Sequence, residues 1–334
     1  MVTKGKILVV GQKSSVFCPP AIKAFEELGY ECLFFDHRTG PAYNSLILKR
    51  LFRLLPVLTF IKDITIRQIN KNLLATVGQF KPDILFVSVG ENISPETITL
   101  IKSRGVKTAN WFTDFISHWH IIKKLAPVYD YFFCPDPPVL EKIKSLNLTN
   151  CFHLPLAIEK VFETPPAYRK EYDIGFVGSY EPTVWKMREP FLASVKDLGL
   201  NIWGPPVWQN TLLKDNYRGR ASGQKMLDIY AKSKIVIDIP WDNFYAESIS
   251  VRPFEVMSVG TCLLFYNIRK DMDRVFKDGV EYVSFTNKEE LRTKVEFYLT
   301  HDQEREDIAR NGFNAITGKH TYLTRMQQVL DTMK

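Results

Sequence analysis

Residues 247–260 read ESISVRPFEVMSVG, and this stretch decides how the second half of the chain folds. Apolar runs lie on both sides of it, at 235–239 and 261–266, so the local order is strand, loop, short helix, strand. Pro253 suits the first turn of a helix, where its missing N–H costs nothing. Gly260 suits the left-handed residue that closes a helix. The spacing therefore predicts a short helix between two buried strands.

The predicted helix starts near Arg252 and Pro253, which leaves Glu247 on the preceding loop and places Phe254 and Glu255 in the first turn. A helix N-terminus offers free N–H groups and a partial positive charge, which favour a phosphate. A carboxylate beside that position can bind sugar or ribose hydroxyls. These five residues therefore form a candidate site for a nucleotide sugar.

Glu247 and Glu255 in this setting resemble the Glu-x7-Glu motif of retaining GT-B glycosyltransferases. The wording RPFEVMSVGTCLL at 252–264 is similar to the CgeB-like (spore maturation protein) glycosyltransferase group of bacterial glycan biosynthesis. Further segments that resemble this group occur in the same order at 172–182, 201–208, 276–299, 304–312 and 319–326. The resemblance covers residues 172–330 and is weaker in the first half of the chain.

The resemblance implies a GT-B fold, in which two Rossmann-like domains face each other across a cleft. It implies an enzyme that moves a sugar from a nucleotide-diphosphate sugar to a glycan, lipid-linked or protein acceptor. The reaction would be retaining and would need no metal or other cofactor. In it Glu255 would bind the ribose hydroxyls, and Glu247 would be a catalytic residue at the donor sugar.

Two other functions remain open. One is a GT-B nucleotide-sugar epimerase, which would need acid and base groups around the donor; the absence of histidine between 172 and 300 argues against it. The other is a non-catalytic nucleotide- or sugar-binding module, which should have lost the two glutamates.

The length of 334 residues favours two domains, because one hydrophobic core rarely grows that large. Strands alternate with helices in 1–160 and again in 172–320, which predicts an α/β protein with a doubly wound parallel sheet in each domain. A linker at 155–171 contains three prolines. A closing helix at 321–334 could pack back onto the first domain. The first domain would take the acceptor and the second the donor.

Ligands of such sheets bind beyond the carboxyl ends of the strands. In the first domain this rim includes residues 11–15, 90–92 and 113–114, and of these we assign Gly11, Lys13 and Ser14 to the acceptor side. Asp114 also follows a strand, and His118 comes four residues later. Such a pair could act as acid and base, with Asp114 catalytic, or bind acceptor hydroxyls. The alternative is that Asp114 caps a helix and His118 is a surface residue.

A second glycine turn lies at the start of the donor domain, in VGSYEPTVWKMR. Gly178 and Ser179 follow a strand, and a glycine there lets the backbone approach a ligand closely. Lys186 and Arg188 lie at the start of the next helix, and the resemblance implies that such cations bind the donor diphosphate. The alternative is a glycine turn followed by two solvated basic residues.

The net charge of +7 favours anionic partners, such as nucleotide diphosphates or anionic lipid, and nucleic acid is the least favoured of these. Five cysteines without a Cys-x-x-Cys pair argue against a zinc site and for a reducing, cytoplasmic location. Asp271 and Asp273 have the spacing of a metal motif, but we interpret them as solvated helix residues.

Residues 46–67 combine apolar side chains with Lys49, Arg50 and Arg53. A basic amphipathic helix of this kind could lie on an anionic membrane, at the inner face of the cell membrane. The alternative is a core helix with a solvated basic face, and Pro56 would interrupt either one.

Overall fold

The computed structural model describes residues 3–39, 59–113, 118–159, 162, 164–240, 249–267 and 272–334. The chain divides into two compact units. The first unit contains residues 1–155 and 322–334, and the second contains 156–321. Each unit is built on its own parallel sheet, so the predicted α/β class is confirmed.

The first unit has a six-stranded parallel sheet with the order β2-β1-β3-β4-β5-β6. Its strands are β1 (Lys6–Gly11), β2 (Glu31–Asp36), β3 (Ile84–Ser88), β4 (Lys107–Trp111), β5 (Tyr131–Cys134) and β6 (Cys151–His153). All five residues of β3 are buried, as expected for a strand of a parallel sheet that is covered on both faces.

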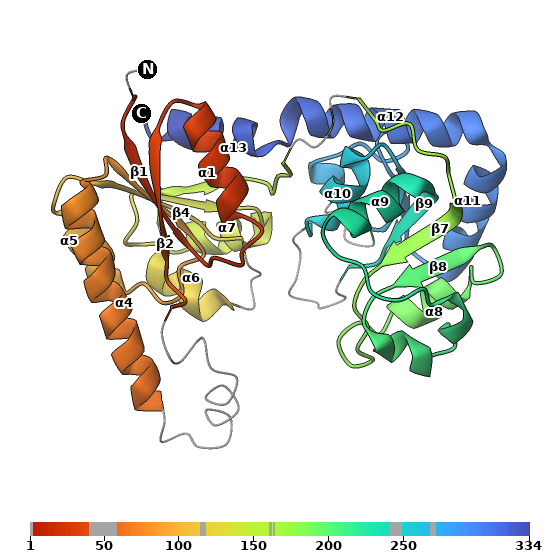
Figure 1. Ribbon diagram of the computed structural model, residues 1–334, viewed down its shortest axis with the longest axis horizontal. Helices are drawn as coiled ribbons and strands as arrows, with labels where there is room; N and C mark the ends of the chain where they lie inside the picture. Colours follow the sequence, from red (N-terminus) through yellow and green to blue (C-terminus); the bar gives the residue numbers. More distant parts are fainter. Residues whose placement is uncertain are drawn as a thin grey trace. The chain divides into compact units, whose positions relative to one another are not determined.

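Helices cover the sheet of the first unit on both faces (Figure 1). They are α1 (Cys18–Glu27), α4 (Thr59–Phe80), α5 (Pro95–Lys102), α6 (Trp119–Leu125), α7 (Pro137–Lys144) and α13 (Tyr322–Thr332). Proline occupies the first turn of α1, α5 and α7, where its missing N–H costs nothing. The oxygen of Ser94 caps α5 by accepting a hydrogen bond from the Thr97 N–H.

The C-terminal helix α13 belongs to the first unit, although the whole second unit, 156–321, separates it in sequence from the rest of the first unit. It packs against α1. The Tyr322 ring meets the buried Trp111 ring edge to face at 6.0 Å. The Lys107 ammonium group donates a 2.8 Å hydrogen bond to the Met333 carbonyl. Both ends of α13 are therefore tied to β4 of this unit.

The second unit has a five-stranded parallel sheet with the order β11-β10-β9-β7-β8. Its strands are β7 (Tyr172–Val177), β8 (Leu200–Trp203), β9 (Ser233–Asp238), β10 (Cys262–Tyr266) and β11 (Val283–Phe285). Its helices are α8 (Arg188–Ala193), α9 (Gln224–Lys232), α10 (Arg252–Ser258), α11 (Lys288–Thr300) and α12 (Asp302–Lys319), with short 3-10 turns at Pro206–Asn210, Lys214–Asn216 and Met272–Arg274.

The predicted helix of the opening motif is α10, which begins at Arg252 with Pro253 in its first turn. Gly260 follows it with φ of +67°. Asp273 lies in a 3-10 turn rather than the predicted helix. Its carboxylate accepts hydrogen bonds from Asn267 and from the buried Tyr282 hydroxyl, so it is not merely solvated. Its predicted companion Asp271 is outside the described residues.

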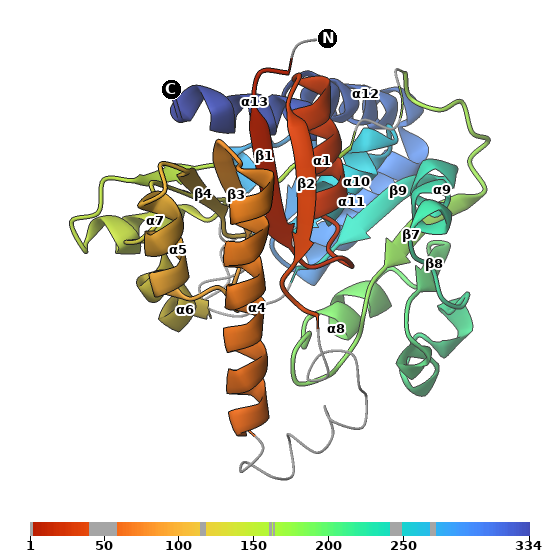
Figure 2. The same cartoon turned by 60° about the vertical axis from the view of Figure 1, so that its left-hand side comes forward.

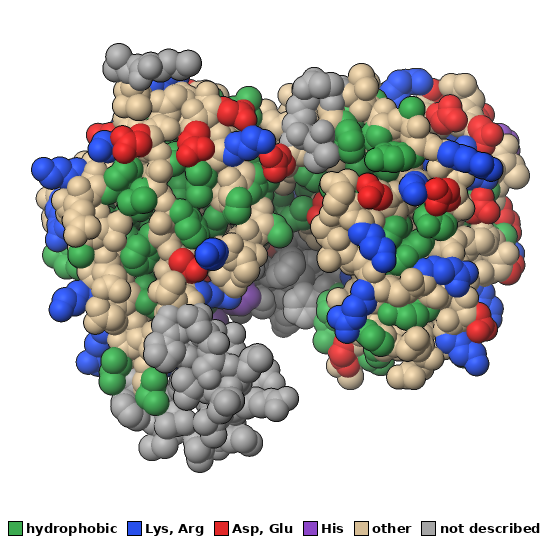
Figure 3. Space-filling view, viewed as in Figure 1, with side chains coloured by type: hydrophobic (Ala, Val, Ile, Leu, Met, Phe, Trp, Pro, Cys, Tyr) green, Lys and Arg blue, Asp and Glu red, His purple; other side chains and the backbone are tan. Residues whose placement is uncertain are grey.

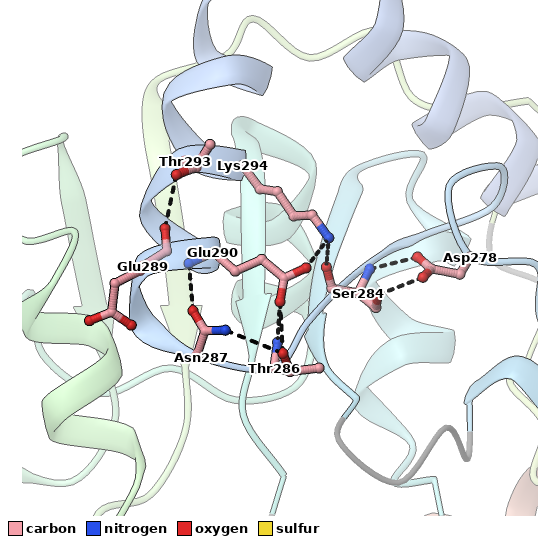
Figure 4. A network of polar contacts seen from close by, with 8 residues as sticks. All are labelled: Asp278, Ser284, Thr286, Asn287, Glu289, Glu290, Thr293 and Lys294. Carbon is pink, nitrogen blue, oxygen red and sulfur yellow. Dashed lines mark hydrogen bonds and ion pairs between the residues drawn. The ribbon is translucent and has the colours of Figure 1, made fainter.

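The connection from β11 to α11 is fixed by a network of side-chain hydrogen bonds (Figure 4). Asn287 caps α11 by accepting from the Glu290 N–H at 2.8 Å, and Glu290 accepts in turn from the Thr286 N–H at 2.8 Å. Lys294 donates to the Ser284 carbonyl and to Glu290, both at 2.6 Å. This reciprocal capping holds α11 at the edge of its sheet.

In each sheet the strand order reverses at one place, which we call the switch point. In the first unit β2 and β3 lie on opposite sides of β1 (Figure 2), so the switch point is at the carboxyl ends of β1 and β3. In the second unit β8 and β9 lie on opposite sides of β7, so it is at the carboxyl ends of β7 and β9. Ligands of doubly wound sheets bind at such points.

Candidate functional site

The Gly178 turn is packed against a second glycine at the second unit's switch point. The Gly178 N–H donates to the Trp203 carbonyl, and the Gly178 carbonyl accepts from the buried Trp208 indole, both at 2.9 Å. A Cβ on Gly178 would lie 2.8 Å from the Phe176 ring. A Cβ on Gly204 would lie 2.2 Å from the Gly178 carbonyl oxygen. The turn can therefore form only because both positions lack a side chain.

Arg188 links the two strands that flank this switch point. Its side chain is buried, and its guanidinium lies 4.8 Å from the Trp185 ring centroid. Its Nε donates to the Ile239 carbonyl at 2.9 Å, and its NH1 donates to the Ser179 carbonyl at 2.5 Å. The alternative of a solvated side chain is wrong for Arg188, whereas Lys186 is exposed.

A buried ion pair joins the end of β9 to the start of α10. Asp238, the last residue of β9, is fully buried, and its Oδ1 pairs with the Arg252 guanidinium. Arg252 retains 19% side-chain exposure. The Phe176 ring lies near both guanidinium groups, with its centroid 5.6 Å from Arg188 and 6.0 Å from Arg252. Two cations from different elements thus converge on one aromatic ring.

The charges of this cluster perturb one another. Burial and the neighbouring Arg252 hold the pKa of Arg188 well below its ordinary range. Burial acts against the charge of Arg252 as well, but Asp238 raises its pKa above the ordinary range. Burial raises the pKa of Glu255, as does Asp238, whereas Arg252 opposes the rise. Two guanidinium groups and two carboxylates, those of Asp238 and Glu255, therefore meet in this cluster, and Arg252 is the arginine that keeps some exposure to solvent.

The other described residues that were predicted for the donor side also belong to the second unit. Pro253 and Phe254 are buried in α10, and Ser179 follows Gly178, with its carbonyl taken by Arg188. Glu247 is outside the described residues, so its relation to Glu255 is as well.

In the first unit, Gly11 ends β1, and Lys13 and Ser14 are exposed on the loop that follows. A Cβ on Gly11 would lie 2.1 Å from the Cys18 sulfur, so this turn also needs a glycine. His118 stands at the N-cap of α6, and its buried Nδ1 has no hydrogen-bond partner among the described residues. Asp114 lies outside them.

The switch point of the first unit also holds a polar cluster, of which the sequence prediction places residues 90–92 on the rim but does not include Arg38 or His37. Arg38 follows β2, and its Nε donates to Glu91 at 2.6 Å. The Asn92 amide donates to the carbonyl of the buried His37 at 3.2 Å. Val89 has φ of +62°, a strained value for a β-branched residue. The sequence signal for this cluster was the polar residues that follow two strands, β2 and β3.

Asp238 was missed for a different reason. The sequence prediction treats 235–239, IVIDI, as an apolar strand, although an aspartate interrupts the run. Tyr230 was missed as well. Its buried hydroxyl has no hydrogen-bond partner in the described part of the chain. Burial raises the pKa of this hydroxyl, and the neighbouring Arg252 opposes the rise. A charged residue inside a buried strand was the available signal for Asp238.

Similar proteins agree with this architecture. A family model described as glycosyl transferase-like matches residues 187–331. Sucrose-phosphate synthase from Thermosynechococcus elongatus has 10% identity and a TM-score of 0.72, with 98% of each chain covered. HepE from Anabaena, solved with UDP, has 10% identity and a TM-score of 0.65, covering 98% of this chain and 99% of its own.

A glycosyltransferase from Rickettsia africae has 11% identity and a TM-score of 0.67, covering 99% of this chain and 98% of its own. No curated protein matches the chain by sequence. With its two parallel-sheet units and these structural neighbours, the protein has the GT-B fold, as predicted.

Proposed function

We propose that this protein is a glycosyltransferase that uses a nucleotide-diphosphate sugar as its donor. The observation that carries the proposal is the convergence of Arg188 and Arg252 around Asp238 at the second unit's switch point. Arg252 is paired with Asp238 yet part exposed, so an anion can approach a guanidinium that is already held by the protein. A diphosphate is an anion of the size and charge that two guanidinium groups bind well.

The roles of the residues follow from this assignment. Arg252, which is part exposed, binds the diphosphate, with Lys186 as a further exposed cation, while Arg188 shapes the turn that receives it. Glu255 binds the ribose hydroxyls and Glu247 the donor sugar. Catalysis then rests on stabilising the charge of the departing phosphate, which is an electrostatic and positioning task.

Support for the donor class comes from the glycosyl transferase-like match over 187–331 and from the GT-B neighbours. One neighbour, HepE, was also solved with UDP-glucose. The CgeB-like resemblance favours the same class. In this proposal the sugar is transferred with retention and without a metal, to a glycan, lipid-linked or protein acceptor that the first unit binds.

The location and membrane contact are part of the same proposal. Among the described residues, none of the helices has the length and apolar character of a membrane span. Contact at the inner face of the cell membrane would run through the basic segment 46–67. Residues 46–58 lie outside the described residues, and the rest belongs to α4, on which Lys62 and Arg67 are exposed and Ile69 is buried.

A thermal-shift panel of nucleotides and nucleotide sugars tests the donor assignment. A ligand that binds only the folded state at one hundred times its Kd stabilises it by about 2.7 kcal/mol. We expect nucleoside diphosphates and one nucleotide sugar to raise the Tm, and the free nucleoside to raise it less. A panel in which no nucleotide raises the Tm would contradict the proposal.

The product assay separates the three functions. A glycosyltransferase releases the nucleoside diphosphate faster when an acceptor is added. An epimerase converts the nucleotide sugar without any acceptor, and a binding module does neither. The donor identified by thermal shift is incubated with glycan, lipid-linked and protein acceptors, and the released nucleotide and the sugar product are both quantified.

A further inference from the structure

Asp238 belongs to no motif that the sequence suggests, yet it occupies the centre of the donor-side cluster. It ends β9 and is fully buried. Its Oδ1 pairs with Arg252, and its Oδ2 has no hydrogen-bond partner in the described residues. A buried carboxylate is costly unless it is paired, and Arg252 provides that pair.

Arg188 cannot replace Arg252 as the partner of this carboxylate. Two of its donors are already directed at the Ser179 and Ile239 carbonyls, which hold the guanidinium in place. The guanidinium of Arg252 has one edge on Asp238 and lies near the Phe176 ring. The Arg252 side chain is about one fifth exposed, whereas that of Arg188 is buried, so Arg252 is the one of the two with access to solvent. Asp238 therefore decides how Arg252 is oriented.

We propose that Asp238 is a positioning residue, which holds the Arg252 guanidinium in the orientation that receives the donor's diphosphate. The inference rests on the proposed function, because it assigns the diphosphate to Arg252. A planar guanidinium that is fixed in advance loses less freedom when it binds a phosphate oxygen pair. Asp238 does not touch the ligand and acts through Arg252.

If only the net charge of the site mattered, the opposite result would be expected. The direction of the change in diphosphate affinity therefore distinguishes the two explanations. Asp238 is negative, so its removal should strengthen the binding of any anion if only the net charge of the site matters. If Asp238 positions Arg252, the Asp238→Asn variant binds diphosphates more weakly, although the site has gained positive charge. A ligand without phosphates should bind equally well in both proteins.

The test is titration calorimetry of UDP, inorganic pyrophosphate and uridine on the full-length protein. We expect Asp238→Asn and Arg252→Lys each to weaken UDP and pyrophosphate binding about tenfold, the effect of losing one charge-assisted hydrogen bond. Uridine binding should not change. The double variant should lose little more than either single variant, because residues that act as one unit are not additive.

The matched control is Asp197→Asn, which makes the same chemical change in the same unit. Asp197 is exposed and pairs with Arg292 at 2.9 Å. Its replacement should leave all three affinities unchanged. Near-ultraviolet circular dichroism and thermal unfolding establish that each variant is folded. If Asp238→Asn does not fold, Asp238→Glu keeps the charge but moves it by one methylene group, and it should weaken pyrophosphate as well.

The outcomes separate the inference from the proposed function. Pyrophosphate binding that is unchanged or tighter in the folded Asp238 variant overturns the inference and leaves the donor assignment intact. Wild-type protein that binds pyrophosphate but no nucleotide overturns the proposed function, while the sign of the Asp238 effect still decides the positioning role. Wild-type protein that binds neither UDP nor pyrophosphate overturns both.

Discussion

The Nε of Arg188 donates a 2.9 Å hydrogen bond to the carbonyl of Ile239, which joins the first residue of α8 to the end of β9. The second bond of the same guanidinium, to the Ser179 carbonyl, is 2.5 Å long. One side chain thus connects the two strand ends at which a doubly wound sheet binds its ligand.

Arg188→Lys should destabilise the protein and weaken nucleotide binding. A single ammonium group cannot reach both carbonyls, so one buried acceptor loses its donor, at a cost of about 1–3 kcal/mol. Arg310→Lys is the control, because Arg310 is exposed and pairs with Asp307 on the surface of α12, where such pairs contribute about 1 kcal/mol or less. Urea unfolding and UDP titration measure both effects. Equal stability of the two variants would count against the conclusion that Arg188 joins the two strand ends.

Glu255→Gln should separate stability from nucleotide binding. Because the folded state raises the pKa of Glu255, this residue's stabilising contribution is present at acid pH and is lost as the pH rises through its folded pKa. The neutral glutamine should therefore raise the Tm at pH 8, and the gain should vanish below the ordinary glutamate pKa of about 4.3. Nucleotide binding at pH 8 should weaken, because glutamine accepts ribose hydroxyls less well.

The affinity of the wild-type protein for UDP should also fall on acidification, starting above the ordinary titration range of a glutamate. The variant should not show this extra loss, and the titration of UDP itself cancels when the two proteins are compared at each pH. Glu289→Gln, on the exposed surface of α11, should behave as wild type. Parallel pH profiles for wild type and Glu255→Gln would refute the ribose assignment.

Gly204→Ala should be destabilising, because a Cβ there would lie 2.2 Å from the Gly178 carbonyl oxygen and 2.9 Å from the Trp208 Nε1. Overpacking of this kind costs about 1–3 kcal/mol. Gly318→Ala is the matched control: it lies inside α12 with nothing within 4 Å of a new Cβ. Alanine there should stabilise the helix by about 0.5–1 kcal/mol. Opposite signs of the two changes in denaturant midpoint are the expected result.

Replacing Lys49, Arg50 and Arg53 together by glutamine should reduce binding to anionic vesicles. Each basic residue near such a surface contributes about 1 kcal/mol, so three could change partitioning by roughly 100-fold at low salt. The control replaces Lys225, Lys277 and Lys288, which are exposed in the second unit (Figure 3 shows how basic and acidic side chains are interspersed on one face). Co-sedimentation measures both, and wild-type protein that stays in the supernatant at low salt ends the membrane proposal.

Transfer should persist in excess EDTA, since the positive charge at the departing phosphate would come from arginine. Within the described ranges there is no group of three or more histidine, cysteine, aspartate or glutamate side chains that could hold a metal ion. The measurement is nucleotide release from the donor with and without EDTA. Complete loss of activity that Mg²⁺ restores would overturn this prediction.

The local features of the fold could be read from the sequence. The start of α10 at Arg252, the closing Gly260 and the glycine turn at Gly178 depend on backbone preferences of a few consecutive residues, which are the same in any protein. The uniformly apolar runs likewise predict strands that are covered on both faces. From these elements the parallel α/β architecture follows.

Tertiary structure alone decided which residues of the candidate site meet. Arg188 and Ile239 are 51 positions apart, and Asp238 and Arg252 are 14 apart. Their contacts exist because β7 and β9 are neighbours at the switch point. Sequence patterns indicate how each segment buries its apolar face. A buried aspartate, however, is tolerated only where a cation from another element pairs with it. That pairing depends on strand order. The sequence by itself thus determined the elements, and strand order determined the charged cluster that they form.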